Sequence, residues 1–493
     1  MSDRSEVKRH TKCLCNCVSD NHLMGLESKP VHLLFFPLMA AGHMLPLVDM
    51  AKLFASHGAR ATVVTTKSNA ASIEPALRSS AIDLFVLPFP STAETGLPEG
   101  SEDLAAFPDL ESRSKFLAAV AKLQAPFRRL LFDLRPDAIV TDSFLPWTLS
   151  DAESLNIPRI VFHGICFFAL CGSESQRSLL SRTDTNTDTV VLPSLPHRIE
   201  MLRSQLPVMT KNGNVFNELL DTIAKTEPRS YGVVVNSFYE LEPEYAEHYR
   251  NVLGRRAWHV GPVCICNPLR GGQRNAIDQN ECLTWLNTKQ TRSVVYVSFG
   301  SLSQFSEAQL REIALGLEKS NVSFIWVIRE CENDDWVPEN YMDRIGERGF
   351  VLRGWAPQIL ILNHESVGGF VTHCGWNSSL EAISAGVPMA TWPLFGDQFL
   401  NEKLLVEVLR VGIPIGSKQY AVAPEDRPVV GAGKVEMAIR RLMCEEEEET
   451  KERRRKVKEL GAMAKRALEV GGSSYADVDR LIEELMNRRL LSE

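Results

Sequence analysis

Short apolar runs alternate with amphipathic stretches along most of the chain. Five runs with the character of buried strands lie at 31–36, 61–66, 137–142, 159–164 and 231–237. The stretches between them carry apolar residues at helical spacing, as in Leu47, Met50, Ala51 and Phe54. A strand–helix alternation of this kind predicts a parallel sheet covered by helices.

A second series of the same kind follows the first. Its predicted strands are 293–301, 323–328, 349–354, 368–373, 387–393 and 411–416. Two such series in tandem predict two doubly wound α/β domains. The predicted boundaries are a flexible N-terminal extension at 1–29, a first domain at 30–257, a Pro- and Gly-bearing linker at 258–278, a second domain at 279–474 and a C-terminal helix at 475–493 that packs back on the first domain.

Composition narrows the classes of function. The chain has 493 residues and a net charge of −8 with no basic stripe, which argues against nucleic acid as a partner. No apolar run reaches the roughly 18 residues of a membrane span. Because the N-terminus lacks the apolar centre of a signal peptide, we expect a soluble cytoplasmic protein. We also expect a monomer.

The 11 cysteines do not indicate a disulfide framework. The odd count and the apolar neighbours of Cys166, Cys171 and Cys374 predict reduced thiols in the core. The run Cys13, Cys15 and Cys17 has the wrong spacing for a zinc knuckle, and we expect it in a disordered tail.

The stretch "THCGWNSSLEAISAGVPMATWPLFGDQ" (372–398) gathers residues that are costly to bury or reactive. A strand ends at His373, and Asn377 and Ser378 are helix-cap residues, with Gly386 as a stop. A helix N-terminus at the end of a parallel strand can bind phosphate.

Other interpretations of this stretch are open on these residues alone. His373 and Cys374 could suggest a zinc site, but adjacent side chains project differently and no second pair has ligand spacing. A nucleophile elbow would need a G-x-S-x-G motif, which this stretch lacks. A capped core helix without a ligand also fits.

The wider segment 355–398, "WAPQILILNHESVGGFVTHCGWNSSLEAISAGVPMATWPLFGDQ", is similar nearly residue for residue to the donor-binding box of plant UDP-dependent glycosyltransferases. The resemblance covers about residues 30 to 490 and implies the GT-B fold, two Rossmann-like domains facing each other across a cleft. It implies that Trp355 stacks on uracil, that the Ala356 backbone pairs with the uracil edge, and that Gln358 and Glu381 hold the ribose hydroxyls. It implies further that His373, Asn377 and Ser378 hold the diphosphate together with the helix N-terminus. It also implies that Ser301, Trp376, Asp397 and Gln398 reach the sugar hydroxyls.

Within the resemblance, the closing residue of the segment bears on the donor. A closing glutamine usually goes with UDP-glucose in this family and a closing histidine with UDP-galactose. Gln398 therefore favours UDP-glucose, although another UDP-sugar remains an alternative.

A histidine early in the chain is the candidate base. His43 follows the first predicted strand in "FFPLMAAGHMLPLVDMA", beside Gly42 and at a helix start, where α/β domains expose reacting groups. This stretch resembles the corresponding region of the same transferases, in which the histidine is the catalytic base. Asp142 ends a buried strand and is the candidate partner that orients the imidazole, whereas Asp137 lies at the strand's other end.

These residues predict a direct displacement. His43 takes the proton of an acceptor hydroxyl, which attacks the anomeric carbon of UDP-α-glucose, and UDP leaves with inversion to a β-glucoside. No metal and no cofactor are expected, because the D-x-D pair Asp477 and Asp479 lies in a predicted helix, where its carboxylates point apart. Leaving-group charge would be stabilised by His373, Ser378 and the helix dipole.

The expected partners are a UDP-sugar and a small hydroxylated acceptor. Candidates for the acceptor pocket are Phe144, Trp147, Phe167, Phe168 and the neighbourhood of Leu206 to Met209, although core packing explains each of these equally well. The resemblance includes a subgroup acting on triterpenoids, steroids and flavonoids, and it does not choose among them.

Two other classes of function compete with the transferase. A glycosidase or phosphorylase of similar fold would show paired carboxylates or a cofactor lysine, and neither is evident. A sugar-nucleotide-binding protein without catalysis would lack the base, whereas His43 and Asp142 are both present.

Overall fold

The computed structural model describes residues 29–78, 80–107, 109–180, 188–207, 215–267, 276–328, 335–444 and 446–492. Residues Val31–Glu493 form one compact unit. The predictions for the N-terminal extension, its cysteines and Met209 concern residues outside the described ones.

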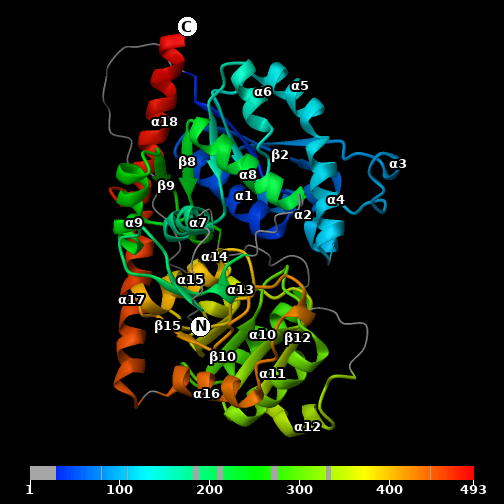
Figure 1. The fold of residues 1–493 in the computed structure, drawn as a ribbon, viewed down its shortest axis with the longest axis vertical. Coiled ribbons are helices and arrows are strands. Elements are labelled where there is room, and N and C mark those ends of the chain that lie inside the picture. Colours follow the sequence, from blue (N-terminus) through cyan, green and yellow to red (C-terminus); the bar gives the residue numbers. More distant parts are fainter. Residues whose placement is uncertain are drawn as a thin grey trace, which may run out of the picture. The chain divides into compact units, whose positions relative to one another are not determined.

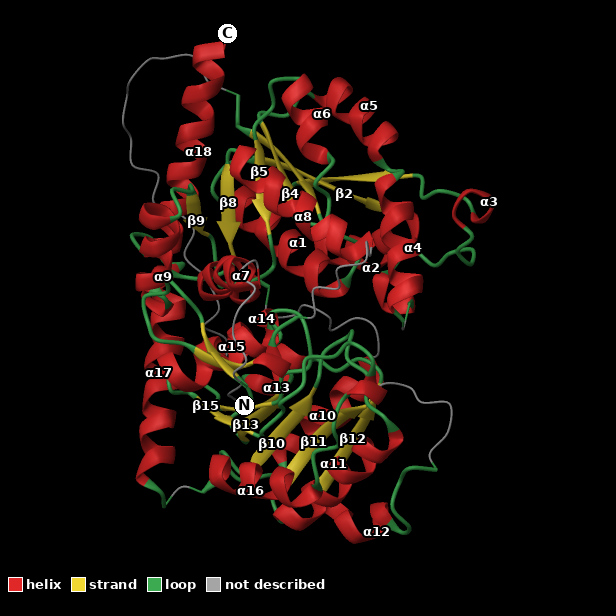
Figure 2. Ribbon diagram, in the orientation of Figure 1, coloured by secondary structure: helices red, strands yellow, loops and turns green. Residues whose placement is uncertain are grey.

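The first half of this unit is built on a seven-stranded sheet in the order β3-β2-β1-β4-β5-β8-β9 (Figures 1 and 2). All its strands pair in parallel. Their bounds are β1 (His32–Phe36), β2 (Arg60–Thr66), β3 (Ile82–Leu87), β4 (Ala138–Asp142), β5 (Arg159–Phe162), β8 (Gly232–Val235) and β9 (Ala257–His259). Strand order reverses between β1 and β4, which makes that point the switch point of a doubly wound sheet.

α-Helices connect these strands along the chain. They are α1 (Ala41–Ser56), α2 (Lys67–Leu77), α3 (Thr92–Thr95), α4 (Leu110–Ala121), α5 (Gln124–Leu134), α6 (Thr148–Ser154), α7 (Phe167–Leu180), α8 (Val215–Thr226) and α9 (Pro243–Glu247). A short antiparallel pair, β6 (Thr189–Val191) and β7 (Glu200–Leu202), stands apart from the sheet. The predicted strand–helix alternation is confirmed.

The second half is built on a six-stranded parallel sheet in the order β12-β11-β10-β13-β14-β15. Its strands are β10 (Val294–Ser298), β11 (Ser323–Ile328), β12 (Gly349–Arg353), β13 (Val367–Thr372), β14 (Met389–Thr391) and β15 (Gly412–Pro414). The switch point lies between β10 and β13. Five of the six strands fall within the runs predicted for them, and β13 begins one residue before its predicted run, 368–373.

The helices of this half are α10 (Ala276–Asn287), α11 (Glu307–Ser320), α12 (Tyr341–Ile345), α13 (Gln358–Leu362), α14 (Trp376–Ala385), α15 (Gln398–Lys403), α16 (Ala432–Met443) and α17 (Glu448–Ala467). One side of the sheet is filled by a cluster that includes Val297, Leu317, Trp326 and Ile439. The helix α17 is strongly charged, and its Arg455 pairs with Glu452 and Glu459 at the surface.

The last helix, α18 (Ser473–Ser492), belongs to the core of the first sheet. Val478, Leu481 and Leu485 are buried in one cluster with residues of β1, β2 and α1. Asp477 accepts a hydrogen bond from the His259 backbone N–H at 2.8 Å, and Asp479 lies 2.6 Å from His57 Nδ1. The two carboxylates of the D-x-D pair therefore serve different neighbours, as the helical spacing predicts.

Two strands of the first sheet were not predicted. The edge strand β3 has a polar residue, Asp83, in its second position and is exposed at three of its six residues, so its pattern differs from that of the buried strands. The strand β9 spans only Ala257–His259, and its last two residues fall inside the predicted linker. A three-residue strand is too short to be recognised from its pattern of apolar and polar residues. In the described part of the chain, no helix is long and apolar enough to cross a membrane.

Candidate active site

His43 and Asp142 meet at the switch point of the first sheet. His43 lies in the first turn of α1, and Asp142 is the last residue of β4. His43 Nδ1 is 2.7 Å from Asp142 Oδ2, and the Asp142 side chain is fully buried, whereas 21% of the His43 side chain is exposed. Asp142 Oδ1 accepts the Phe144 backbone N–H at 3.0 Å. Because His43 Nδ1 faces the Asp142 carboxylate, Nε2 is the imidazole nitrogen that can take a proton from a substrate.

The surroundings favour the protonated form of this histidine. Burial by itself would lower the pKa of His43, but the charge and hydrogen bond of Asp142, together with the charge of Asp397, raise it above its ordinary value. The positive charge that forms on a base is therefore stabilised. Asp137, at the other end of β4, accepts instead from the His32 backbone N–H at 2.7 Å.

A buried arginine supports the turn that follows Asp142. Arg159 is 2% exposed, and its Nε lies 2.9 Å from the hydroxyls of both Thr141 and Thr148. One terminal nitrogen lies 3.4 Å from the carbonyl oxygens of Asp142 and Leu145. Burial lowers the pKa of Arg159 to about 10, so the guanidinium stays charged at neutral pH. The role of Arg159 could not be predicted from the sequence, because an arginine at the start of a strand resembles a surface charge.

In the second half, three residues predicted for the donor meet between α13 and α14. Gln358 Nε2 donates to Glu381 Oε2 at 2.7 Å and to Ser378 Oγ at 3.0 Å. Gln358 Oε1 accepts from the Tyr296 hydroxyl at 3.2 Å. Because Glu381 is nearly buried and oriented in this way, its carboxylate is suited to accept hydrogen bonds from a pair of hydroxyls.

His373 lies in the turn between β13 and α14 and is packed against two glycines. Gly375 belongs to the same turn, and Gly300 follows β10. A Cβ atom at Gly300 would lie 2.6 Å from His373 Nε2, and one at Gly375 would lie 2.4 Å from it, so larger residues would displace the imidazole. Cys374 holds a left-handed φ of 64° in the same turn. Burial lowers the pKa of His373 to about 4, so the imidazole is neutral at pH 7 and offers an N–H rather than a charge.

Asn377 connects the two halves. It lies in the first turn of α14, and its Nδ2 donates to the Gly42 carbonyl oxygen at 2.6 Å. Gly42 directly precedes His43. Since an amide carries two N–H groups, the second can donate to a ligand at the helix N-terminus.

Asp397 and Gln398 stand at the start of α15. Gln398 Oε1 accepts the backbone N–H groups of Leu394 at 2.8 Å and Phe395 at 3.1 Å, so Nε2 is the donor side of this amide. Asp397 Oδ2 accepts from Asn401 Nδ2 at 2.7 Å. Burial raises the pKa of Asp397 to about 6.

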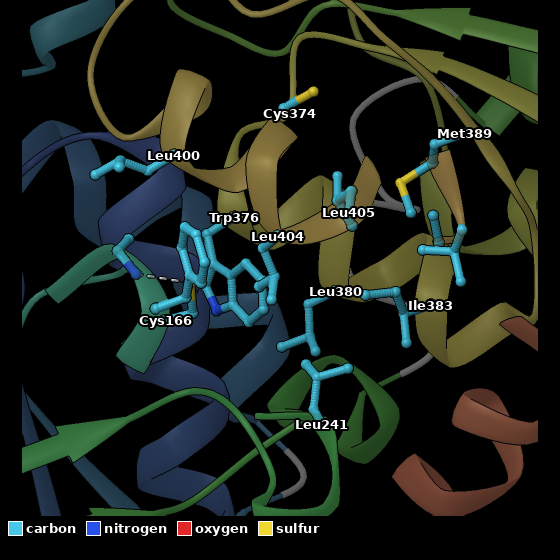
Figure 3. Packing of buried hydrophobic residues seen from close by; sticks show 14 of the residues in the cluster. Cys166, Leu241, Cys374, Trp376, Leu380, Ile383, Met389, Leu400, Leu404 and Leu405 are labelled. Atoms are coloured by element: carbon cyan, nitrogen blue, oxygen red, sulfur yellow. Dashed lines mark hydrogen bonds between the residues drawn. The ribbon is translucent and has the colours of Figure 1, made fainter. Parts of the chain in front are cut away.

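The predicted sugar contact of the Trp376 side chain is wrong. The indole is 2% exposed and lies in a core cluster with Cys166, Leu380 and Leu404 (Figure 3). Its N–H donates to the Asn236 carbonyl oxygen at 2.7 Å. Because an indole has one donor, this side chain joins the two halves and has nothing to offer a sugar hydroxyl.

The remaining predicted donor residues follow strands of the second sheet. Ser301 comes shortly after β10 and is half-buried, and Trp355 follows β12 and is also half-buried. Ala356 is 8% exposed, and its carbonyl oxygen accepts the Gln358 backbone N–H at 2.9 Å. All three lie at the carboxyl ends of parallel strands, where α/β sheets bind ligands.

The predicted acceptor residues divide into two groups. Phe144 is half-buried, and its ring stands edge-on to His43 with 5.6 Å between centroids, so it borders the base. Trp147 is half-buried against Phe36 and Phe127. Phe167 and Phe168 are fully buried, and lining a pocket is wrong for both.

The physical reason is that Phe167 and Phe168 begin α7 and point into the core. Phe167 packs on Tyr249 and His259, and Phe168 packs on Tyr245. Their backbone N–H groups donate to the Glu242 carboxylate at 3.1 and 2.7 Å. Leu206, from the neighbourhood also considered, is 4% exposed.

Metal ligation has no candidate in the described ranges, which contain no group of three His, Cys, Asp or Glu that could hold an ion. The Cys374 thiol is fully buried, and burial raises its pKa well above the ordinary value. Its sulfur lies 3.7 Å from the Thr372 carbonyl oxygen. Cys374 is thus a protonated packing residue, and none of the seven cysteines that the structure describes forms a disulfide.

Comparison with known proteins decides the family. The family model described as "UDP-glucoronosyl and UDP-glucosyl transferase" matches residues 133–412. The scopoletin glucosyltransferase of Nicotiana tabacum is 46% identical over 470 residues, which cover 92% of this chain and 98% of that protein. The chain belongs to this family of glycosyltransferases.

Two further relatives agree with this assignment. UDP-glucose flavonoid 3-O-glucosyltransferase 7 of Fragaria ananassa is 46% identical, with 94% of this chain and 98% of that protein covered. The crystal structure of Glycyrrhiza uralensis UGT73P12 with glycyrrhetinic acid 3-O-monoglucuronide has a TM-score of 0.87 at 39% identity and covers 94% of this chain and 97% of that one. The glycosyltransferase therefore has the GT-B fold predicted for it.

Proposed function

We propose that this glycosyltransferase transfers glucose from UDP-glucose to a hydroxyl of a small, largely apolar plant metabolite, with inversion to a β-glucoside. The observation that carries the proposal is the 2.7 Å contact between His43 Nδ1 and Asp142 Oδ2 at the switch point of the first sheet. A non-catalytic binding protein would not need this arrangement.

In the proposed reaction, His43 Nε2 takes the proton of the acceptor hydroxyl. The hydroxyl oxygen attacks the anomeric carbon, the bond from that carbon to the diphosphate oxygen breaks, and UDP leaves from the opposite side of the sugar. Asp142 stabilises the imidazolium that forms, as the raised pKa of His43 supports. A single displacement of this kind inverts the anomeric centre.

The second half supplies the donor site in this proposal. Glu381 and Gln358 hold the ribose, Trp355 and Ala356 the uracil, and Ser301, Asp397 and Gln398 the sugar. The neutral His373, Asn377, Ser378 and the N-terminus of α14 hold the diphosphate. Their N–H and O–H donors and the helix dipole stabilise the charge that develops on UDP, without a metal.

Two observations support glucose as the transferred sugar. Gln398 has Nε2 as the donor side of its amide, since its oxygen is engaged by the backbone. The relatives from Nicotiana tabacum and Fragaria ananassa are named glucosyltransferases. A different donor is the alternative, since UGT89C1 of Arabidopsis thaliana, 32% identical to this chain, was solved with UDP-L-rhamnose.

The proposed acceptor class is supported by the acceptors named for the relatives and by Phe144, which lies beside His43. The named acceptors of the relatives include scopoletin, a flavonoid and an anthocyanin, and the Glycyrrhiza uralensis structure holds a triterpenoid glucuronide. Phe144 offers an aromatic edge beside His43. We further propose that the enzyme acts in the cytoplasm as a monomer.

The test is a screen of hydroxylated coumarins, flavonoids, steroids and triterpenoids with UDP-glucose, with and without EDTA. We expect a product heavier by one hexose, with the coupling constant of a β-glucoside in its NMR spectrum, and equal rates in both conditions. Faster transfer from UDP-rhamnose or UDP-galactose would replace the donor, an α-glucoside would exclude the single displacement, and loss of rate in EDTA would exclude the metal-free mechanism.

A further inference from the structure

Asn401 is a fully buried amide that joins three parts of the molecule. It lies in α15, one helical turn after Asp397, and is 0% exposed. Its Nδ2 donates to the Asp397 carboxylate at 2.7 Å and to the Cys374 carbonyl oxygen at 2.8 Å. Its Oδ1 accepts from the Cys166 thiol, whose sulfur lies 3.5 Å away.

These three partners determine how the amide is oriented. Two of them, the carboxylate and the carbonyl oxygen, only accept hydrogen bonds, so both require the NH₂ side of Asn401. The third must donate, and burial keeps the Cys166 thiol protonated by raising its pKa well above the ordinary value. A flipped amide would place an oxygen against two acceptors, which excludes the alternative orientation.

The Asn401 amide thereby connects the Cys374 backbone with the Asp397 carboxylate, and the proposed donor site requires these two groups to keep fixed relative positions. Cys374 lies in the strained turn with a φ of 64° beside His373 and Gly375. Asp397 comes from a different segment, and its Oδ2 is held by the Asn401 amide. The link to Cys166 reaches from the first half of the chain into this arrangement.

We propose that Asn401 is a positioning residue that holds the Asp397 carboxylate in place for recognition of the donor sugar. This inference rests on the proposed contact between Asp397 and glucose. Asn401 itself touches no substrate: the Cys374 carbonyl anchors the amide on the diphosphate turn, and the amide fixes the carboxylate relative to that anchor.

The test measures how the enzyme distinguishes sugars, separately from how it binds UDP. Asn401→Leu keeps the volume of the side chain and removes its polar atoms. We expect KM for UDP-glucose to rise about 10-fold and the preference for UDP-glucose over UDP-galactose to fall about 10-fold, as for the loss of one hydrogen bond to a charged group. Inhibition by UDP, which lacks the sugar, should change by less than about 2-fold.

Three further variants make the result decisive. Asn401→Ser leaves space for a water and should give a smaller loss in the same direction, should the leucine variant fail to fold. Leu405→Ala, a buried change in the following turn, should lower Tm without altering the sugar preference. Asp397→Ala should abolish that preference.

Equal weakening of UDP and UDP-glucose in the Asn401 variants would overturn the inference, because the amide would then act on the diphosphate turn. An unchanged sugar preference in a folded Asn401 variant, with Asp397→Ala impaired, would also overturn it. An unchanged preference in Asp397→Ala would instead remove the proposed contact between Asp397 and glucose, and the role of Asn401 with it.

Discussion

The two halves of the molecule use the same sheet topology but assemble their sites in different ways. In the second half, most candidate residues come from one stretch, 355–398, and meet through short-range contacts such as Gln358 with Glu381. In the first half, the site is one pair, His43 and Asp142, separated by 99 residues in the chain. The candidate donor residues are therefore local in sequence, whereas His43 and Asp142 meet only because β1 and β4 pair in the sheet.

The largest expected effect comes from removing the base. His43→Ala should lower kcat by about 10⁴-fold, the upper end for loss of a general base, while the dissociation constant of UDP-glucose stays within about 2-fold. Steady-state kinetics and calorimetry measure the two quantities. His248→Ala, a half-buried histidine in a π-helix away from the dyad, is the control and should behave like the wild type. Unchanged turnover in His43→Ala would refute the mechanism.

The next largest effect concerns the partner of the base. Asp142→Asn keeps the size of the side chain but removes the charge that stabilises the imidazolium, so kcat should fall about 10²- to 10³-fold. Donor binding should again be unaffected. A loss below about 3-fold would mean that the 2.7 Å contact only packs the turn.

The donor half should show the reverse pattern. Glu381→Gln keeps the shape of the side chain and removes the charge that accepts the ribose hydroxyls, so KM for UDP-glucose should rise about 10- to 100-fold with little change in kcat. Inhibition by UDP should weaken in parallel. A fall in kcat without a rise in KM would show that donor binding and catalysis are not divided between the two halves.

Breaking the link between the halves should affect both quantities. Asn377→Leu removes the hydrogen bond to the Gly42 carbonyl oxygen and a donor at the N-terminus of α14. We expect kcat to fall and KM for UDP-glucose to rise, each by about 5- to 10-fold. A change in KM alone would show that the contact with Gly42 does not position His43.

The smallest effect is a shift in the pH profile. The base must be neutral, and its pKa is raised, so kcat/KM should fall as the pH drops through a midpoint above the ordinary value of 6.5. In Asp142→Asn, burial remains and the raising charge is lost, so the residual activity should have its midpoint at lower pH. A wild-type midpoint below 6.5 would contradict the raised pKa.

The sequence could predict those parts of the fold that depend on continuous patterns. Eleven of the thirteen strands in the two large sheets coincide with apolar runs, and the exceptions are the half-exposed β3 and the three-residue β9. The pairing of His43 with Asp142 was predictable because both lie at strand ends beside one switch point.

The direction of a side chain was harder to predict. Trp376 sits in a segment that also carries site residues, and Phe167 and Phe168 begin α7, yet packing turns all three into the core. Asn401 and Arg159 were missed because their partners are backbone oxygens and side chains from other segments, which no spacing in the sequence reveals. The spacing of Asp397 and Asn401, four residues apart on one helix face, was the one available signal.

The place of α18 in the core has a consequence for how the protein is made. Val478, Leu481 and Leu485 cover the first sheet, but they follow every strand of both sheets in the chain. On the ribosome, the first sheet therefore emerges without one of its covering helices and keeps that apolar surface open while the entire second half is translated. The N-terminal half is synthesised first, but its core is complete only when α18 has been synthesised. Chaperones that recognise nascent chains therefore have a long period in which to bind this surface.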